Sequence, residues 1–462
     1  MKNNTNLHAI LWLKTGITAL AIAGLYSIIL VLLRTPGLNQ LFTDKSIFKS
    51  ALVIHVNLSV LVWLLAITCI IWSISKVRSG FESLFTYIAI AGMALMALSP
   101  LYPESVPIMN NYVPMLENIF FAIGLGLFGT AILCFAIQTI LTSFMGDAFS
   151  DYGERIIAIT KITSAMMYVA VWICFILSFI GVSALSEIVP LDIEFFYEML
   201  FWSGGHLLQF IYTQILMIVL LILAEGWRGG RIGSHAEYEL ILVLNFVLSL
   251  AVFLGHAYYD IADGLFKEFF TRHMIYSGGV APVIFIAMLI AEIVQKRTPN
   301  VPTFIPAAFV SSVLLFLSGG AIGAVISGVN VTIPAHYHGS IVGISVAFMG
   351  LSYMLCFQKN VAGSLTEKGG VISFIIPNSR SDNTKSQRSA SWQIYTVTIG
   401  QILHIGGLAL AGGYGVMRKT PGEEIALSAK VYMGMVGAGG LLAIIGGLMF
   451  VYICARKLFY RE

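Results

Sequence analysis

Charged residues are scarce in this sequence, since Asp, Glu, Lys and Arg together make up 11% of its 462 residues and hydrophobic residues make up 58%. An ordinary soluble domain carries about 25% charged residues. This composition therefore excludes a soluble globular protein and predicts one that is embedded in a lipid bilayer. The net charge of +3 is small and dispersed along the chain, so no nucleic-acid partner is expected.

Paired cysteines are also missing. The five cysteines lie in apolar runs and form no Cys-x-x-Cys pair, which argues against a disulfide framework and against a cysteine metal site. The Cys-x-x-Cys-His motif that attaches haem covalently is absent as well. The cysteines are interpreted as small hydrophobic residues of the protein interior.

Long apolar runs are abundant, and windows of about 20 apolar residues predict membrane-spanning helices. We expect an all-α polytopic membrane protein with twelve transmembrane helices, forming one domain over residues 1–462. The polar segment 359–391 is expected to be a mobile cytoplasmic loop. The predicted spans are 10–33, 51–74, 84–101, 114–142, 156–183, 195–224, 237–259, 273–295, 302–327, 332–358, 393–415 and 429–455.

The distribution of basic residues predicts the orientation. With a cytoplasmic N-terminus, the inner segments and inner helix ends hold 18 of the 26 Lys and Arg residues. Three segments on the opposite side, 102–113, 184–194 and 328–331, contain neither Lys nor Arg. The excess of positive charge inside predicts that both termini are cytoplasmic.

Two histidines one residue apart, His336 and His338, open the tenth predicted span in the stretch Ile333-Pro334-Ala335-His336-Tyr337-His338-Gly339. Residues two apart on a helix point to nearly opposite faces, so one segment can present imidazoles to two different partners. Imidazole binds haem iron and copper, and a polar residue inside a bilayer is a candidate functional residue. The alternative is a pair of interfacial histidines in contact with lipid headgroups.

Three further histidines, His55, His206 and His256, fall in the same outer half of the membrane in the predicted topology. Histidines that serve only the core would not be expected to converge on one depth, so the set favours haem or metal binding. His404 lies deep in the eleventh span and is interpreted as a structural histidine, whereas His273 is expected at the interface. Glu198, near a helix end, is expected to extend its carboxylate to the interface.

These residues resemble the catalytic subunit (subunit I) of the haem–copper oxidase superfamily, which includes terminal oxidases and nitric oxide reductases. Four short motifs with five histidines carry the resemblance in the family's order over nearly the whole chain: Ala51-Leu52-Val53-Ile54-His55, Gly205-His206, Gly255-His256 and His336-Tyr337-His338. The resemblance implies twelve helices around two haems, one low-spin and held by two histidines, the other high-spin and facing a non-haem copper or iron.

The resemblance also implies a role for each residue. It assigns His55 and His338 to the low-spin haem, His336 to the high-spin haem, and His206 and His256 to the non-haem metal. Arg418 and Lys419, basic residues on the outer side, would pair with haem propionates. Electrons would come from a partner subunit, from cytochrome c or a cupredoxin, or from quinol, and the substrate would be a small gas. The protein would be integral to a bacterial or archaeal cytoplasmic membrane.

Two positions depart from the family pattern. The seventh helix of the family offers two adjacent histidines, whereas His256 is followed here by Ala257. The non-haem metal then lacks its third ligand, for which we expect Asp260, with Tyr258 and His273 as less favoured candidates. In addition, many oxygen-reducing members carry a tyrosine four residues after the sixth-helix histidine, and Phe210 occupies that place here.

The missing tyrosine bears on the substrate. Splitting the O–O bond takes four electrons, whereas coupling two NO molecules takes two. In those oxidases the tyrosine donates an electron and a proton to oxygen. Its absence here favours reduction of NO to N₂O, with an O₂-reducing cytochrome c or quinol oxidase as the alternative. A haem sensor or electron relay without turnover is a second alternative, and a twelve-span secondary transporter is a third; transporters usually place their site at the midplane of the membrane.

Overall fold

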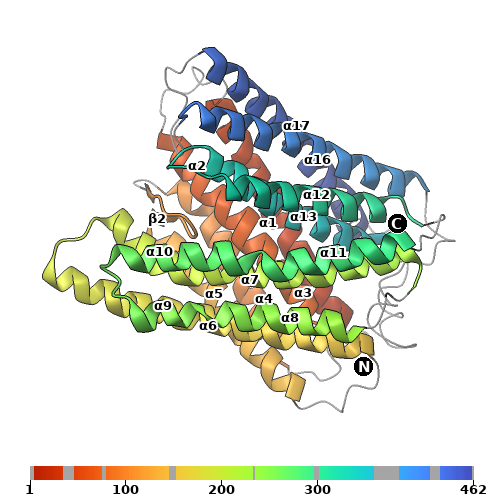
Figure 1. Cartoon of the computed structure of the whole chain (residues 1–462), viewed down its shortest axis with the longest axis horizontal. Coiled ribbons are helices and arrows are strands. Elements are labelled where there is room, and N and C mark those ends of the chain that lie inside the picture. Colours follow the sequence, from red (N-terminus) through yellow and green to blue (C-terminus); the bar gives the residue numbers. More distant parts are fainter. Residues whose placement is uncertain are drawn as a thin grey trace.

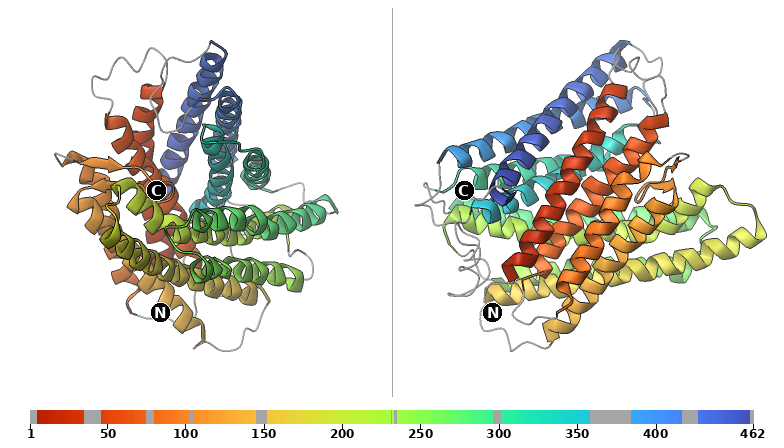
Figure 2. Two further views of the ribbon diagram at one scale, coloured as in Figure 1. Left: turned by 60° about the vertical axis from the view of Figure 1, so that its left-hand side comes forward. Right: turned by 180° about the vertical axis from the view of Figure 1, so that it is seen from behind.

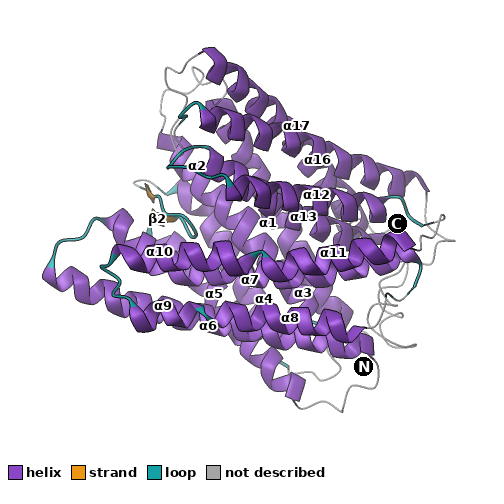
Figure 3. Ribbon diagram, in the orientation of Figure 1, coloured by secondary structure: helices purple, strands orange, loops and turns teal. Residues whose placement is uncertain are grey.

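Twelve helical segments of the described chain are long and apolar enough to cross a membrane, and they confirm the all-α polytopic prediction. Helices make up nearly all of the ribbon and run side by side along its length (Figure 3). The computed structural model describes residues 5–34, 46–74, 80–102, 105–144, 152–230, 232, 235–295, 301–357, 384–416 and 427–459.

The twelve spans follow one another along the chain. The first turn of α1 and the last turn of α17 lie at the same end of the bundle, opposite the small hairpin (Figures 1 and 2). The helices that make up the spans are α1 (Thr5–Arg34), α2 (Ser46–Val56) with α3 (Trp63–Trp72), α4 (Glu82–Leu98), α5 (Ile119–Phe144), α6 (Tyr152–Ile188), α7 (Ile193–Arg228), α8 (His235–Leu250) with α9 (Val252–Tyr258), α10 (Gly264–His273) with α11 (Val280–Gln295), α12 (Phe304–Ala324), α13 (Thr332–Phe357), α16 (Thr384–Gly413) and α17 (Leu427–Phe459).

Three predicted boundaries are wrong. The fourth span starts at Ile119 because residues before it form a two-stranded hairpin, β1 (Val106–Ile108) paired antiparallel with β2 (Met115–Glu117). The eighth begins at Gly264, where the Asp263 carboxylate caps α10 by accepting from the Leu265 amide. The eleventh begins at Thr384, so the last residues of the predicted 359–391 loop are helical, and the rest of that loop lies outside the described residues.

Helix α7 is the central element, with almost its whole apolar stretch buried by neighbouring helices (Figure 1). It begins where the Asp192 carboxylate accepts hydrogen bonds from the Glu194 and Phe195 amides. It ends at Gly229, whose φ of 73° suits a residue without a β-carbon. Because neighbouring helices cover most of α7, side chains in its buried stretch can be polar without facing hydrocarbon.

Small residues let the helices approach closely. A β-carbon at Gly92 of α4 would lie 2.5 Å from the Gly124 carbonyl oxygen of α5, and one at Gly319 of α12 would lie 2.2 Å from the Ser340 amide of α13. Association of helices in lipid depends on such backbone packing, because lipid chains are as apolar as leucine. These glycines therefore allow α4 to pack closely on α5 and α12 on α13.

Two π-helical turns interrupt the spans directly after histidines. One covers Asn57–Val62, just beyond His55, and the other covers Met274–Gly278, just beyond His273. Single π-turns inside α-helices occur frequently at functional sites, because the extra residue rotates the side chains that follow.

The orientation of the bundle stays a prediction, which cysteine labelling can test. In a variant without the five native cysteines, a cysteine introduced at Ser364 should react only with a reagent that reaches the cytoplasm. A cysteine at Thr420 should react with an impermeant reagent added to intact cells. Labelling of both positions from one side would contradict the twelve-span topology, and a cysteine at the exposed Tyr258, on the same predicted side as Thr420, serves as a control.

Candidate functional site

His206 lies near the start of the buried stretch of α7 and is only 3% exposed. Its Nδ1 atom is 2.7 Å from the carbonyl oxygen of Trp202, one turn earlier. A carbonyl can only accept a hydrogen bond, so Nδ1 carries the proton and donates it. In the neutral imidazole, Nε2 then bears the lone pair with which a metal could be bound.

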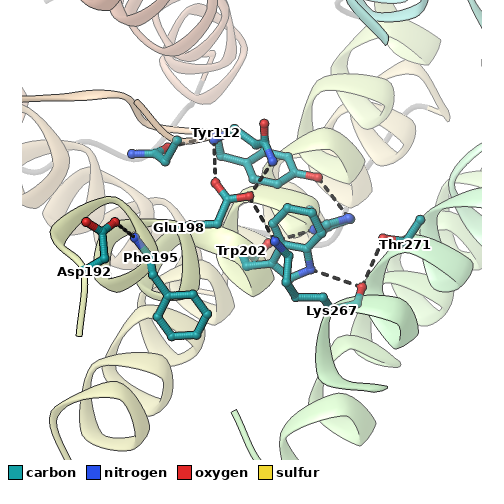
Figure 4. Close-up of polar contacts among 10 residues, drawn as sticks. Tyr112, Asp192, Phe195, Glu198, Trp202, Lys267 and Thr271 are labelled. Atoms are coloured by element: carbon teal, nitrogen blue, oxygen red, sulfur yellow. Dashed lines mark hydrogen bonds and ion pairs between the residues drawn. The ribbon is translucent and has the colours of Figure 1, made fainter. Parts of the chain in front are cut away.

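The hydroxyl of Tyr112 donates a hydrogen bond to that nitrogen, with Oη 2.9 Å from Nε2 of His206 (Figure 4). Tyr112 belongs to the turn between β1 and β2, and its ring packs edge-on against Trp202 with centroids 5.6 Å apart. A β-carbon on Gly205 would lie 2.2 Å from Cγ of Tyr112. Only glycine at position 205 leaves room for this phenol beside His206.

Glu198 holds the Tyr112 turn against α7. Its carboxylate accepts hydrogen bonds from the backbone amide and the side-chain amide of Asn111, the residue before Tyr112. Lys267 of α10 pairs with the same carboxylate at 3.3 Å and lies 4.4 Å from the ring centroid of Trp202 (Figure 4). Glu198 was expected to reach the interface on its own, but it instead joins the turn, α7 and α10.

His256 on α9 presents a buried nitrogen without a partner. Its Nε2 makes no hydrogen bond and is shielded from solvent. Its ring contacts Phe266 at 5.3 Å and Phe270 at 5.7 Å between centroids, and the His206 ring contacts Phe270 at 5.9 Å. A buried, unpaired imidazole nitrogen is costly unless something binds it, so His256 has the character of a ligand.

His273 is buried rather than interfacial. It stacks on Phe210, with ring centroids 5.1 Å apart, and its Nε2 donates to the Leu248 carbonyl at 2.9 Å. Its Nδ1 is also buried without a hydrogen-bond partner. A surface pocket of about 360 Å³, with Tyr259 and Arg272 in its wall, reaches the His273 side chain.

Three histidines on α2 and α13 share one pattern, in which Nδ1 donates to a backbone carbonyl. His55 donates to Ala23 at 3.1 Å, His336 to Gly319 at 2.8 Å, and His338 to Pro334 at 2.8 Å. In haem and metal proteins this hydrogen bond selects the tautomer whose Nε2 binds the metal and orients the ring. The pattern therefore fits axial ligands.

The imidazoles of His336 and His338 contact different helices, as their spacing predicted. His336 faces α12, where a β-carbon on Gly323 would lie 2.5 Å from its Nδ1. His338 faces α16, with its ring 5.0 Å from that of His404. His404 donates from Nδ1 to the Val436 carbonyl at 2.9 Å. The sequence did not anticipate that His404 lies beside His338.

Comparison with known proteins decides the family. The family described as Cytochrome C and Quinol oxidase polypeptide I matches residues 8–442. The chain belongs to this oxidase polypeptide I family. An uncharacterized protein of Rickettsia prowazekii (strain Madrid E) is 40% identical over 524 aligned positions, covering 99% of this chain and 97% of the relative. An uncharacterized protein of Aquifex aeolicus (strain VF5) is 27% identical over 349 positions, covering 74% of this chain and 83% of the relative.

Members of the oxidase polypeptide I family generally bind haems and a copper or iron centre, which makes this chain a haem–copper-type oxidoreductase. The residues present fit such groups on two observations. The Nδ1 donors of His55, His336 and His338 leave Nε2 as the basic nitrogen, and His256 holds a buried nitrogen that nothing in the described chain satisfies.

The side chain of Asp260, the expected third metal ligand, is engaged within its own turn. Its side chain is exposed, and Oδ1 accepts from the Ala262 amide in its own turn at 3.0 Å. Among the described residues, no three His, Cys, Asp or Glu side chains are grouped closely enough to hold a metal ion. Tyr258, the other nearby candidate, is 76% exposed. Arg418 and Lys419, predicted to meet haem propionates, lie outside the described residues.

Proposed function

We propose that this protein is a respiratory oxidoreductase that transfers electrons to a small gas, with reduction of NO to N₂O favoured. The observation that carries the proposal is the pair formed by His206 and His256, whose rings both contact Phe270. The tautomer of His206 leaves a lone pair on Nε2, and the Nε2 atom of His256 is buried and unpaired. They would hold the non-haem copper or iron, and His336 the high-spin haem.

The low-spin haem would be held by His55 and His338, and its propionates by Arg418 and Lys419. When bound, the haems and the metal supply the electrons and a positive charge that polarises the bound gas. The electron donor is a partner subunit, cytochrome c or a cupredoxin, or quinol. We place the protein in a bacterial or archaeal cytoplasmic membrane with both termini in the cytoplasm.

The surroundings of His206 support NO over O₂. Reduction of NO consumes two electrons and two protons (2 NO + 2 e⁻ + 2 H⁺ → N₂O + H₂O) and needs no side chain that donates a further electron. Phe210, which has no hydroxyl, occupies the place where many oxidases carry a tyrosine, and its ring is stacked on His273. Phe266 and Phe270 pack against His256, and Phe269 stacks on His273, so the surroundings of these two rings are largely apolar.

Reduction of O₂ is the second candidate, and one contact favours it. Tyr112 brings a phenol to His206 from a part of the chain where none was expected. A phenol beside the metal is a source of one electron and one proton, which O–O cleavage requires. The absence of tyrosine at position 210 alone therefore does not decide the substrate.

Turnover measured with an artificial electron donor tests the proposal. The purified protein should consume NO under anaerobic conditions faster than it consumes O₂ in the absence of NO. His336→Ala is the matched control and should lose both activities. O₂ reduction with negligible NO consumption would replace NO by O₂ as substrate, and inactivity towards both gases in protein that contains haem and metal would favour a sensor or relay.

A further inference from the structure

The predicted metal site is one ligand short, and the side chain that completes it comes from the hairpin turn outside the helices. Ala257 removes the expected histidine, and the carboxylate of Asp260 is turned to its own backbone. The structure instead places the phenol of Tyr112 directly beside the nitrogen of His206 that would bind the metal.

The spacing of these two atoms is that of two ligands of one ion. Ligand atoms about 2.0–2.2 Å from a metal, separated by angles of 90° to 109°, lie roughly 2.9–3.5 Å from each other. Oη of Tyr112 and Nε2 of His206 are 2.9 Å apart. A metal at Nε2 would take the place of the hydroxyl hydrogen, so Oη would have to shift sideways from the lone-pair direction to bind the same ion.

Tyr112 is held in this place by contacts that a loop residue rarely has. Asn110 caps the turn, because its Oδ1 accepts from the amides of Tyr112 at 3.1 Å and Val113 at 2.8 Å. Glu198 holds the intervening Asn111 and is itself paired with Lys267. A ligand fixed by its own supporting contacts binds a metal more tightly, since less conformational freedom is lost on binding.

We propose, on the basis of the function proposed above, that the oxygen of Tyr112 is the third protein ligand of the metal held by His206 and His256, and that this metal is iron. Two imidazoles and one anionic oxygen, with coordination positions left open, form the kind of ligand set that non-haem iron occupies. When the metal binds, the Tyr112 O–H bond breaks, its proton passes to water and a bond from oxygen to metal forms. No electron moves in this step.

The ligand role agrees with reduction of NO. A phenol oxygen bound to the metal is no longer a hydroxyl that can donate to a bound gas. Its negative charge also lowers the net charge of the metal centre, which the surrounding phenylalanines cannot do. Tyr112 would then be a ligand and not the missing donor of an oxidase.

Resonance Raman spectroscopy of the intact, haem-loaded protein tests the proposal without any substitution. Metal-bound phenolate gives ring vibrations that shift when the protein is grown on ring-deuterated tyrosine, and haem vibrations do not shift. We expect such bands in the wild-type protein together with non-haem iron in elemental analysis. Non-haem metal without isotope-sensitive bands would overturn the ligand role, and copper in place of iron would overturn the choice of metal.

The variant Tyr112→Phe is the second test of the ligand role, because it keeps the ring packing on Trp202 and removes only the hydroxyl. It should lose the isotope-sensitive bands and bind the non-haem metal at least about tenfold to a hundredfold more weakly in competition with a chelator. Tyr258→Phe, an exposed tyrosine close to His256 in sequence, should match the wild type. Unchanged bands and metal affinity in Tyr112→Phe would refute the proposal.

These readouts are separate from the test of the proposed function. If the protein lacks haem or turns over neither gas, the proposed function fails whatever the phenolate bands show. If haem and turnover are present and the phenolate bands are absent, only the role of Tyr112 fails.

Discussion

Replacing His338 with alanine should abolish the low-spin haem signal of the purified protein, and His55→Ala should do the same. A low-spin iron needs two strong axial ligands, and each substitution would remove one of the two proposed ligands. High-spin haem should remain in both variants, because His336 is oriented separately by its hydrogen bond to Gly319 on α12. Reduced-minus-oxidised absorption spectra and low-temperature electron paramagnetic resonance would report both signals.

His404→Gln is the control that the structure supplies. The rings of His338 and His404 are 5.0 Å apart, and each donates from Nδ1 to a backbone carbonyl, so His404 is the residue most easily mistaken for the ligand. We expect His404→Gln to retain the low-spin signal. Loss of that signal in His404→Gln with its retention in His338→Ala would transfer the axial role to His404.

A single methyl group at position 323 should disable the high-spin haem site. A β-carbon on Gly323 would lie 2.5 Å from Nδ1 of His336, closer than real β-carbon contacts come. His336 must then move by about 1 Å and lose its hydrogen bond to Gly319, and a displacement of that size at a reacting centre costs about a hundredfold in rate. Steady-state gas consumption and the high-spin absorption band should both change in Gly323→Ala.

Gly320→Ala separates this effect from a general effect on α12. It lies on the same helix, and a β-carbon there would meet nothing within 4 Å. Alanine favours helix over glycine by about 0.8–1.0 kcal/mol, so this variant should fold well and keep wild-type turnover. Equal losses in the two variants would show that the packing of Gly323 against His336 is not what the site depends on.

The twelve spans could be predicted from the sequence because the cause is local. In hydrocarbon every backbone amide and carbonyl must find a partner within the protein, so each apolar run of sufficient length forms a helix. The predictions were wrong where a span meets the aqueous face. At residues 106–117 a hairpin pairs its own backbone, and at Gly264 the cap provided by Asp263 starts a helix nine residues before the expected span.

The candidate histidines were identifiable for a similar reason. Two residues one apart on a helix diverge whatever surrounds them, and His336 and His338 do contact different helices, α12 and α16. Their partners could not be read from the sequence, because Gly319 and His404 approach them only through helix packing. The assignment of each histidine to a haem or to the non-haem metal stays a prediction.

Tyr112 was missed because it stands 94 residues from His206 in a segment that carries the marks of an ordinary loop. One signal was available, since the glycine before His206 leaves a space that some side chain must fill. Which side chain fills it depends on the hairpin and on the contacts of Glu198 with Asn111 and Lys267. Asp260 follows His256 by four residues, but α9 ends at Tyr258 and the Asp260 carboxylate bonds to the Ala262 amide of its own turn.

The sequence by itself determined that this chain crosses the membrane twelve times, and it singled out the histidines that a haem–copper-type protein would use. The spans follow from composition, which acts over a few turns of one helix, whereas the roles of the histidines are what the resemblance to the family implies. Only the tertiary structure decided the surroundings of those histidines. The Tyr112 phenol contacts His206, Gly323 packs against His336, and Nε2 of His256 is buried without a hydrogen bond. These depend on contacts between helices distant in sequence, whose approach is set by packing over the whole bundle.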